Sequence, residues 1–372
     1  MAAAQLSDVS DALSLIYGAR LTTQINSVAV LPFLLPTLPG DGKALFWTAE
    51  FSGAADASAS TEGAAYSSSD ADDEAEEDAT LGWAIYDKIA SVTDLAEAAV
   101  ASNFNPGSVG VLGTSLLMGR VRGQVRRVGL GIAADMYGGN PAASPTELAG
   151  AALAIDSSGT FAGIAPTTFT EWAAAENSIA KANLSFKNIR EGLFTPIYDA
   201  SGETPEFCTC DSATFDLIRD LYSDKESYVR EIALGRGGGM DGMEPRIVKL
   251  SAGMQAVEVD GIAIVRDRFA TADTIYGWNT NYVSVRQLLP SGLQRLLMEG
   301  VGAIQDFFRR ITDNPNLILP REELEGMAAR GSGMRPHIKF LGDRGTSKEA
   351  VISVWGQVQW DRRNAFGKLT LT

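Results

Sequence analysis

The clearest alternation of apolar and polar positions runs from Val257 to Leu288. β-Branched and aromatic residues form short runs there, bounded by turn-forming residues, which is typical of strands. The predicted strands are 257–259, 262–265 and 274–278. Asp260-Gly261 predicts a tight turn between the first two strands, and a polar, asparagine-containing segment at 279–282 follows the third.

Apolar residues at spacings of three and four predict one long helix between Pro106 and Tyr137. These residues are Val109, Leu112, Leu116, Val121, Val125, Val128, Ile132 and Met136. Four arginines lie among them and give the helix a basic flank: Arg120, Arg122, Arg126 and Arg127. Glycines at 110, 113, 119, 123, 129 and 131 lower the helix propensity, each by up to about 1 kcal/mol. We therefore expect the helix to pack closely along a sheet before it ends at 138–141, where the sequence is Gly-Gly-Asn-Pro.

The segment from residue 45 to about 92 has a different pattern. Residues 45–47 and 81–86 are strand-like, and the region between them is rich in Ala, Ser, Gly and acidic residues. Seven of the nine residues from Asp70 to Asp78 are acidic, and so dense a run of like charge is either solvated or neutralised by a partner. We predict a long two-stranded loop that projects from the body and needs a neighbouring subunit to order it, because an isolated hairpin is marginally stable in water.

The rest of the chain mixes short helices and strands. Helices are predicted at 183–197, after Asp211-Ser212 and at 293–311, and strands at 207–210, 351–360 and 367–371. The first 44 residues are predicted to form an arm, with a short helix that carries Leu13, Ile16 and Tyr17 and an extended, proline-rich segment after Ser27. Short strands separated by helices indicate an α+β domain.

Composition narrows the class of protein. The chain has 372 residues, 45% of them hydrophobic, which is ample for a buried core and suggests two or three domains. The formal charge of −15 argues against a freely acting nucleic-acid binder, which is usually basic. The N-terminus does not resemble a secretory signal, and no apolar stretch approaches the roughly 20 residues that span a bilayer. We expect a soluble protein made in the cytoplasm.

Candidate chemistry is sparse. His337 is the only histidine, at the expected start of a strand, and we expect it to be structural. Cys208 and Cys210 are too close in sequence for an unstrained mutual disulfide and too few for zinc. The glycine-rich run 235–239 lacks the Gly-Lys-Ser/Thr ending of a phosphate-binding loop, and the acidic run lacks the spacing of a calcium-binding EF-hand loop. We therefore predict no catalytic residue, no metal site and no cofactor.

Three passages, in this order, resemble the major capsid proteins of tailed bacteriophages. The first is the end of the long helix, Ala134-Asp135-Met136-Tyr137-Gly138-Gly139, and the second is Phe161-Ala162-Gly163-Ile164 followed by Trp172. The third combines Gly261-Ile262-Ala263-Ile264-Val265, Arg266-Asp267, Ile275-Tyr276, Trp278-Asn279-Thr280 and Tyr282 with the C-terminal Val358-Gln359-Trp360-Asp361-Arg362-Arg363-Asn364-Ala365-Phe366-Gly367. The resemblance spans roughly residues 45–372.

The resemblance implies an α+β, Hong Kong 97-type capsid (Johnson) fold with five parts. These are an N-terminal arm (1–44), an extended two-stranded loop (45–92), a peripheral domain with a long spine helix (93–144), an axial domain (145–325) and a C-terminal return to the peripheral domain (326–372). In this family some members join subunits covalently through a lysine of the extended loop. There is no lysine between Ala44 and Asp87, so we expect a shell held noncovalently.

The function implied by the resemblance is structural, without enzymatic activity. Copies of the chain would assemble as pentamers and hexamers into the icosahedral head that encloses double-stranded DNA, in the host bacterial cytoplasm, and would remain in the virion capsid. Implied partners are further copies of the chain, a separate scaffolding protein and a portal, with a decoration protein as an option, non-specific contact with packaged DNA and no membrane. Two alternatives stay open: an encapsulin-like compartment shell, and, from another class, a carboxylate-dependent hydrolase or small-molecule binding protein.

The candidate subunit-contact residues are Asp72, Asp73, Glu74, Glu76 and Glu77 of the acidic run and Arg120, Arg122, Arg126 and Arg127 of the long helix. The acidic run is either such a contact or a solvated, flexible tip. The arginines either pair with acids of an adjacent subunit, which the negative net charge favours, or touch DNA phosphates without sequence readout.

Overall fold

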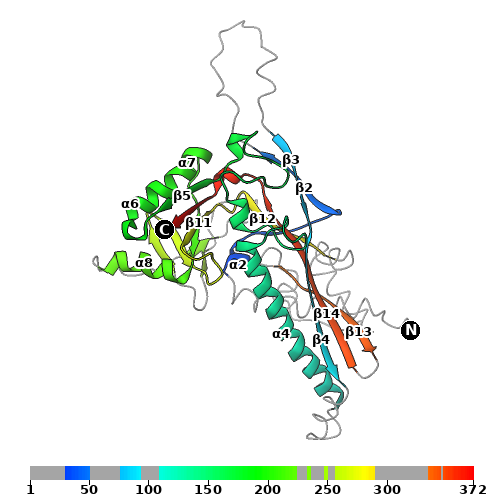
Figure 1. Ribbon diagram of the computed structural model, residues 1–372. Helices are drawn as coiled ribbons and strands as arrows, with labels where there is room; N and C mark the ends of the chain where they lie inside the picture. The colour runs from blue at the N-terminus through cyan, green and yellow to red at the C-terminus, as the bar shows by residue number, and fades with distance from the viewer. Residues whose placement is uncertain are drawn as a thin grey trace, which may run out of the picture.

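Two β-sheets, joined by three stretches of chain, organise the protein (Figure 1). The computed structural model describes residues 30–50, 76–93, 109–223, 233–235, 247–249, 256–289, 334–344 and 347–372. Both sheets are mixed with helices in the way that the sequence indicated for an α+β protein.

The first sheet has the strand order β1-β12-β14-β13, with β4 also paired to β14. Its strands are β1 (Thr37–Pro39), β4 (Ala84–Thr93), β12 (Val283–Leu288), β13 (His337–Arg344) and β14 (Ser347–Trp360). The long helix α4 (Val109–Gly138) lies along β4 and β14 (Figure 1). Its buried residues Val121, Val125, Val128 and Ile132 follow the predicted helical spacing and pack against this sheet.

The glycines of α4 have two different surroundings. Gly131 lies against the Tyr86 ring, 3.9 Å from where a Cβ would be, as expected for close packing along a sheet. Gly119 and Gly123 are exposed, with no atom within 4 Å of a Cβ. Packing against the sheet therefore does not explain these two glycines.

The second sheet has the order β5-β15-β11-β6-β10-β9. Its strands are β5 (Ala175–Ile179), β6 (Phe207–Cys210), β9 (Ala256–Val259), β10 (Ile262–Arg266), β11 (Thr274–Trp278) and β15 (Gly367–Leu371). The three strands predicted between Val257 and Trp278 are thus confirmed. Asp260 (φ 51°) and Gly261 (φ 85°) both adopt the left-handed conformation that a tight hairpin turn requires.

Helices cover one face of the second sheet (Figure 1). They are α6 (Phe186–Ile189), the π-helical η5 (Arg190–Phe194), α7 (Thr195–Ser201) and α8 (Ser212–Ser223). The predicted helix at 183–197 therefore begins later and ends later than expected. The delay has a local cause, because the Ser185 hydroxyl accepts a hydrogen bond from the Asn188 N–H (3.2 Å) and caps the helix there.

A hairpin of β2 (Ala44–Glu50) and β3 (Glu76–Gly82) confirms the predicted two-stranded loop. One face of the hairpin buries Leu45, Trp47, Ala49, Ala79 and Leu81 in the same core as the two sheets. The Trp47 indole N–H also donates a hydrogen bond to the carbonyl of Trp360 (3.1 Å). The base of the loop therefore packs in the core of its own chain, while residues 51–75 lie outside the described part.

Three further expectations need comment. The segment after Ser27 is not extended throughout, because Leu31–Leu34 forms a helical turn (α2) with Pro32 near its start, where proline is tolerated. Of the segment 326–372, β13 and β14 lie in the first sheet, and the last strand, β15, lies in the second. The predicted helices at 293–311 and in the arm, and most of the glycine-rich run 235–239, lie outside the described residues; the division into five domains stays a prediction.

Candidate functional site at the junction of the two sheets

The three passages quoted for the family resemblance meet where the chain crosses between the two sheets. The first crossing, 139–174, connects α4 to β5; the second, 279–282, connects β11 to β12; the third, 361–366, connects β14 to β15. We call these three crossings, together with the turn at 200–206 after α7, the junction.

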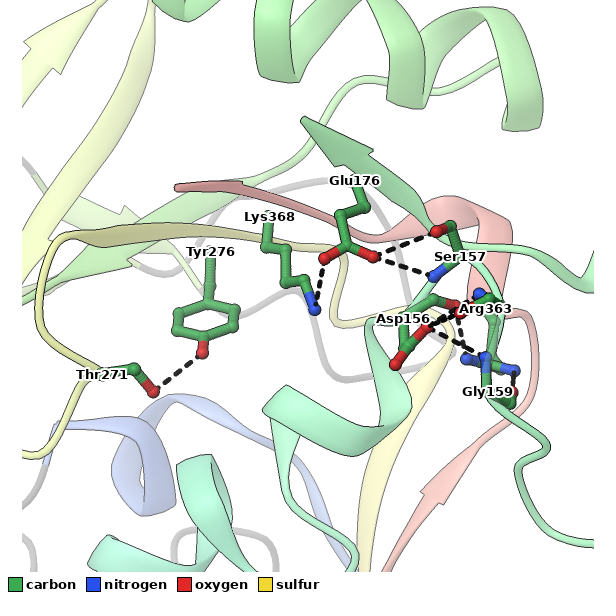
Figure 2. A network of polar contacts seen from close by, with 9 residues as sticks. Asp156, Ser157, Gly159, Glu176, Thr271, Tyr276, Arg363 and Lys368 are labelled. Carbon is green, nitrogen blue, oxygen red and sulfur yellow. Dashed lines mark hydrogen bonds and ion pairs between the residues drawn. The ribbon is translucent and has the colours of Figure 1, made fainter. Parts of the chain in front are cut away.

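Arg363 forms the buried centre of the junction. Its side chain is 0% exposed, and its guanidinium donates hydrogen bonds to three carbonyl oxygens of the first crossing. The acceptors are Ala154 (2.6 Å), Asp156 (2.6 Å) and Gly159 (3.1 Å). Figure 2 labels Arg363 with Asp156 and Gly159 beside it. The third crossing is thereby fastened to the first.

The surroundings of Arg363 explain how a buried cation is tolerated. The guanidinium carbon lies 5.3 Å from the centroid of the Phe161 ring and 5.6 Å from that of Trp172, which is within the range of cation–π attraction. Burial lowers the pKa of Arg363 to about 10, and the nearby Asp156 carboxylate opposes that shift. The guanidinium therefore stays charged at neutral pH.

The Asp156 carboxylate holds the loop whose carbonyls face Arg363. It accepts hydrogen bonds from the N–H groups of Ser158 (2.7 Å) and Gly159 (2.9 Å). Burial alone would raise the pKa of Asp156, but these hydrogen bonds outweigh it and lower the pKa below its usual value. These hydrogen bonds within the loop hold it in the conformation in which its carbonyls face Arg363.

Glu203 binds two side chains of the second crossing. Its two carboxylate oxygens accept hydrogen bonds from the Asn279 amide and the Tyr282 hydroxyl, each at 2.7 Å. Glu206 accepts a further pair from the backbone N–H (3.2 Å) and the hydroxyl of Thr280. The hydrogen bond to Glu203, and then burial, raise the pKa of Tyr282. The polar segment 279–282 is therefore fastened to the turn after α7.

The third crossing reaches the same turn through Arg362 and Asn364. The Arg362 guanidinium lies over the Tyr282 ring, 5.5 Å from its centroid, and donates to the Ser201 carbonyl (3.1 Å). It also donates to the side-chain oxygen of Asn364 (3.0 Å), whose amide donates to the Ala200 carbonyl (3.2 Å). All three crossings are therefore linked to one another.

An aromatic cluster lies beneath these polar contacts. Trp278 stacks on Phe207 with centroids 6.3 Å apart, and it contacts Trp360 (5.6 Å) and Phe366 (6.3 Å). The Trp278 indole N–H donates to the Thr209 hydroxyl (2.9 Å). These rings belong to the core that also contains the base of the β2–β3 hairpin and the end of α4.

The end of α4 is tied to both sheets by two acid–tyrosine pairs. The Tyr86 hydroxyl donates to Asp135 (2.6 Å) and accepts from the Leu148 N–H (3.2 Å). The Tyr137 hydroxyl donates to the buried Asp267 (3.0 Å). Burial raises the pKa of both carboxyl groups above their usual values.

Close backbone approach completes the connection after α4. A Cβ on Gly150 would lie 2.6 Å from the Asp135 carbonyl oxygen and 2.8 Å from that of Tyr137. Backbone atoms cannot move aside as a flexible side chain can. The position therefore requires glycine.

Lys368 and Glu176 link the first crossing to the second sheet. The Lys368 ammonium lies 2.9 Å from one Glu176 oxygen, and the Ser157 N–H (3.2 Å) and hydroxyl (3.0 Å) donate to the other (Figure 2). Burial alone would raise the pKa of Glu176, but Lys368 and Ser157 together lower it.

The predicted subunit-contact residues lie elsewhere. Arg120, Arg122, Arg126 and Arg127 are exposed on α4, and Arg120 donates to the Ser91 carbonyl (2.7 Å). Glu77 is exposed on β3 and Glu76 begins that strand, whereas Asp72, Asp73 and Glu74 lie outside the described residues. In the described part, no ion pair joins these arginines to Glu77.

The described residues offer little catalytic chemistry. They contain no group of three or more His, Cys, Asp or Glu side chains arranged to hold a metal. Cys208 and Cys210 are free and buried, and burial raises the pKa of both thiols. His337 begins β13 as predicted, and burial, followed by the charge of Lys339, lowers its pKa. No described helix combines the length and apolar character that crossing a bilayer requires.

Sequence reasoning missed the acceptors of the junction. Glu203 and Glu176 are single acids in unremarked segments, and no spacing distinguishes them from surface acids. Asn279 and Tyr282, the partners of Glu203, did lie within the passages quoted for the resemblance, as did Asp267 and its partner Tyr137.

Comparison with protein-family models and with curated protein sequences gave no match. Solved structures do match. A chain of the cyanophage A-1(L) capsid asymmetric unit has a TM-score of 0.55 at 15% identity, over 94% of this chain and 92% of that one. A capsid chain of the native GTA particle has a TM-score of 0.50 at 11% identity, over 92% and 89%. A chain of the SrpI encapsulin complex of Synechococcus elongatus has a TM-score of 0.43 at 9% identity, over 91% and 86%.

The first two likenesses establish the fold, because each covers about nine-tenths or more of both chains. The protein has the Hong Kong 97-type capsid fold, with its extended two-stranded loop and long spine helix. The expectation drawn from the sequence is confirmed.

Proposed function

We propose that this chain is the major capsid protein of a tailed bacteriophage. Copies assemble as pentamers and hexamers into an icosahedral head around double-stranded DNA, in the cytoplasm of a host bacterium. The observation that carries the proposal is the likeness to the cyanophage capsid chain along nearly the whole of both chains. A separate scaffolding protein, a portal and an optional decoration protein belong to the proposal as partners, and it assigns no catalytic step to the chain.

The shape of the chain supports repeated contact between copies. The β2–β3 hairpin lies near the C-terminal end of α4, and the first sheet extends from there along the helix (Figure 1). Arg122 and Arg126 lie about 18–24 Å along the axis from that end, at 1.5 Å per residue. Acidic and basic surfaces so placed fit a head-to-tail contact between copies, the kind that closes into rings.

We therefore propose that acids of the hairpin on one copy meet the arginines of α4 on the next. Exposed Glu77 and Phe46, which is 61% exposed, supply a polar and an apolar contact on the described part of the hairpin. The exposed Gly119 and Gly123 carry no side chain. A partner can therefore approach the backbone of α4 closely beside the arginines.

Electron microscopy of the purified full-length protein tests the function. We expect closed shells of defined diameter, and DNA in particles isolated from infected cells. Small discrete oligomers under every assembly condition would refute the proposal, and enzyme cargo in place of DNA would favour a protein compartment.

Charge reversal tests the contact. Arg122→Glu together with Arg126→Glu is expected to abolish shells without unfolding the chain, because both side chains are exposed. Lys88→Glu together with Lys187→Glu, at two exposed positions outside α4, changes the net charge by the same amount and is the control for net charge alone. Shells formed equally well by all variants would exclude the arginine contact.

A further inference from the structure

We infer that the half-buried side of the junction, formed by Glu203, Tyr282 and Arg362, sets the angle between the two sheets and thereby the curvature and diameter of the shell. The inference rests on the proposed function, because it assigns to these residues the choice of shell size.

The junction has two sides that differ in burial. Arg363 is fully buried and binds backbone carbonyls, so its loss would disturb folding itself. Glu203, Tyr282 and Arg362 are only half-buried, and they meet through side chains that extend from separate segments. These contacts can therefore be weakened while the aromatic core beneath them stays packed.

The contacts at Glu203 join the part of the molecule built on the second sheet to the part built on the first. Glu203 follows α7, which packs on the second sheet. Tyr282 immediately precedes β12 of the first sheet, and Arg362 lies shortly after β14 of the same sheet. A rotation of one sheet against the other must change the Glu203–Tyr282 distance, now 2.7 Å, or the position of Arg362 over the ring, now 5.5 Å from its centroid.

A small rotation at the junction becomes a large movement at the far end of the molecule. The 30-residue helix α4 lies along the first sheet, and at 1.5 Å per residue it is about 45 Å long. A rotation of ~3° moves the far end of such a lever by ~2 Å. Contacts that repeat around a ring accumulate such differences, so the angle within one subunit decides at which size the ring and shell close.

Two conservative variants test the inference in the full-length protein. Tyr282→Phe removes one hydrogen bond to Glu203 and keeps the ring beneath Arg362. Glu203→Gln keeps the shape but can accept fewer hydrogen bonds. Lys181→Met is the matched control, because it breaks a partly exposed contact of similar length, to Asp273 (2.7 Å), that lies wholly within the part built on the second sheet.

The readouts are the distribution of particle diameters by electron microscopy and the urea midpoint of the unassembled chain. We expect Tyr282→Phe and Glu203→Gln to increase the fraction of particles outside the wild-type diameter several-fold, and Lys181→Met to leave it unchanged. The double variant Glu203→Gln/Tyr282→Phe should shift the distribution little further than the stronger single variant, because the two changes remove one shared hydrogen bond.

The outcomes separate this inference from the proposed function. Wild-type protein that forms no shells overturns the proposed function. Wild-type shells of one diameter, with the same diameter in both junction variants, overturn the inference alone. So does an equal shift caused by Lys181→Met, because loss of stability and not the angle of the junction would then explain the sizes.

Discussion

Replacing Arg363 by methionine removes the buried charge but keeps a long apolar side chain. Replacing both partners of a buried ion pair by apolar residues is often harmless, because both charges disappear together. Here the acceptors are backbone carbonyls of Ala154, Asp156 and Gly159, and no substitution at position 363 removes them. They lose their hydrogen bonds and stay in place.

The expected cost follows from the burial of those acceptors. The hydrogen bond to Ala154 is buried, and the other two are partly buried, so water replaces them only in part. At about 1–3 kcal/mol for each unsatisfied buried group, the total is about 3–4 kcal/mol. A typical domain is stable by roughly 5–15 kcal/mol, so the variant should remain folded but markedly weakened.

Urea unfolding of the unassembled chain, followed by tryptophan fluorescence, measures this loss. The signal comes from six tryptophans, of which Trp172 lies beside the guanidinium. Arg362→Met is the control; its guanidinium has one backbone acceptor, Ser201, and lies in a half-buried place, so it should cost about 1 kcal/mol. Equal losses in the two variants would refute the argument that the buried carbonyls determine the cost.

Four more substitutions probe the surrounding contacts. Gly150→Ala should lower the free energy of unfolding by about 2–3 kcal/mol, because its methyl group meets backbone oxygens at the end of α4. Gly119→Ala, with no atom within 4 Å of its Cβ, should instead raise that free energy in the unassembled chain by about 0.5–1 kcal/mol. Thermal unfolding measures both. Tyr86→Phe should cost about 1–2 kcal/mol in the same assay, because a backbone N–H loses its acceptor. Glu176→Gln should cost about 1 kcal/mol at pH 7, allowing for solvent screening. Since the folded-state pKa of Glu176 is lowered, this loss should shrink as the pH falls from the usual glutamate pKa of about 4.3 through the lowered folded-state pKa, and vanish below it.

Each of these expectations has a clear contrary result. A Gly150→Ala protein as stable as wild type would show that the turn can move away from α4. A Tyr86→Phe protein without loss would mean that water serves the freed N–H group. An effect of Glu176→Gln that is constant from pH 7 to pH 3 would exclude the ionised carboxylate as its source.

Local patterns allowed the sequence to predict the main elements. The spacing of Val121, Val125, Val128 and Ile132 predicted α4, and those residues are the ones it buries. Asp260-Gly261 predicted a turn, and both residues have the positive φ that the turn needs. These predictions succeeded because helical periodicity and turn chemistry act over a few residues.

Long-range pairing was beyond such patterns. The sequence predicted a strand at 367–371, which the structure confirms, with burial that alternates along it. The local pattern does not identify the sheet that this strand joins. β15 lies between β5 and β11, which precede it by nearly 200 and nearly 100 residues. The acceptors of Arg363 could not be predicted either. Every residue has a backbone carbonyl, so the sequence does not distinguish those that accept a hydrogen bond from a distant side chain.

The order of Arg362, Arg363 and Asn364 follows from the backbone that carries them. Arg362 has an extended backbone, and residues 363–365 after it form a 3₁₀ turn, in which successive side chains point about 120° apart. One side chain can then reach the Tyr282 ring, the next the carbonyls of the first crossing, and the third the end of α7 at Ala200. Three neighbours in sequence thus contact three separate segments. Exchanging the order to Arg-Asn-Arg would keep the composition but direct the short amide toward the carbonyls of the first crossing, which it cannot span. The order of these residues, and not their charge alone, therefore joins the two sheets.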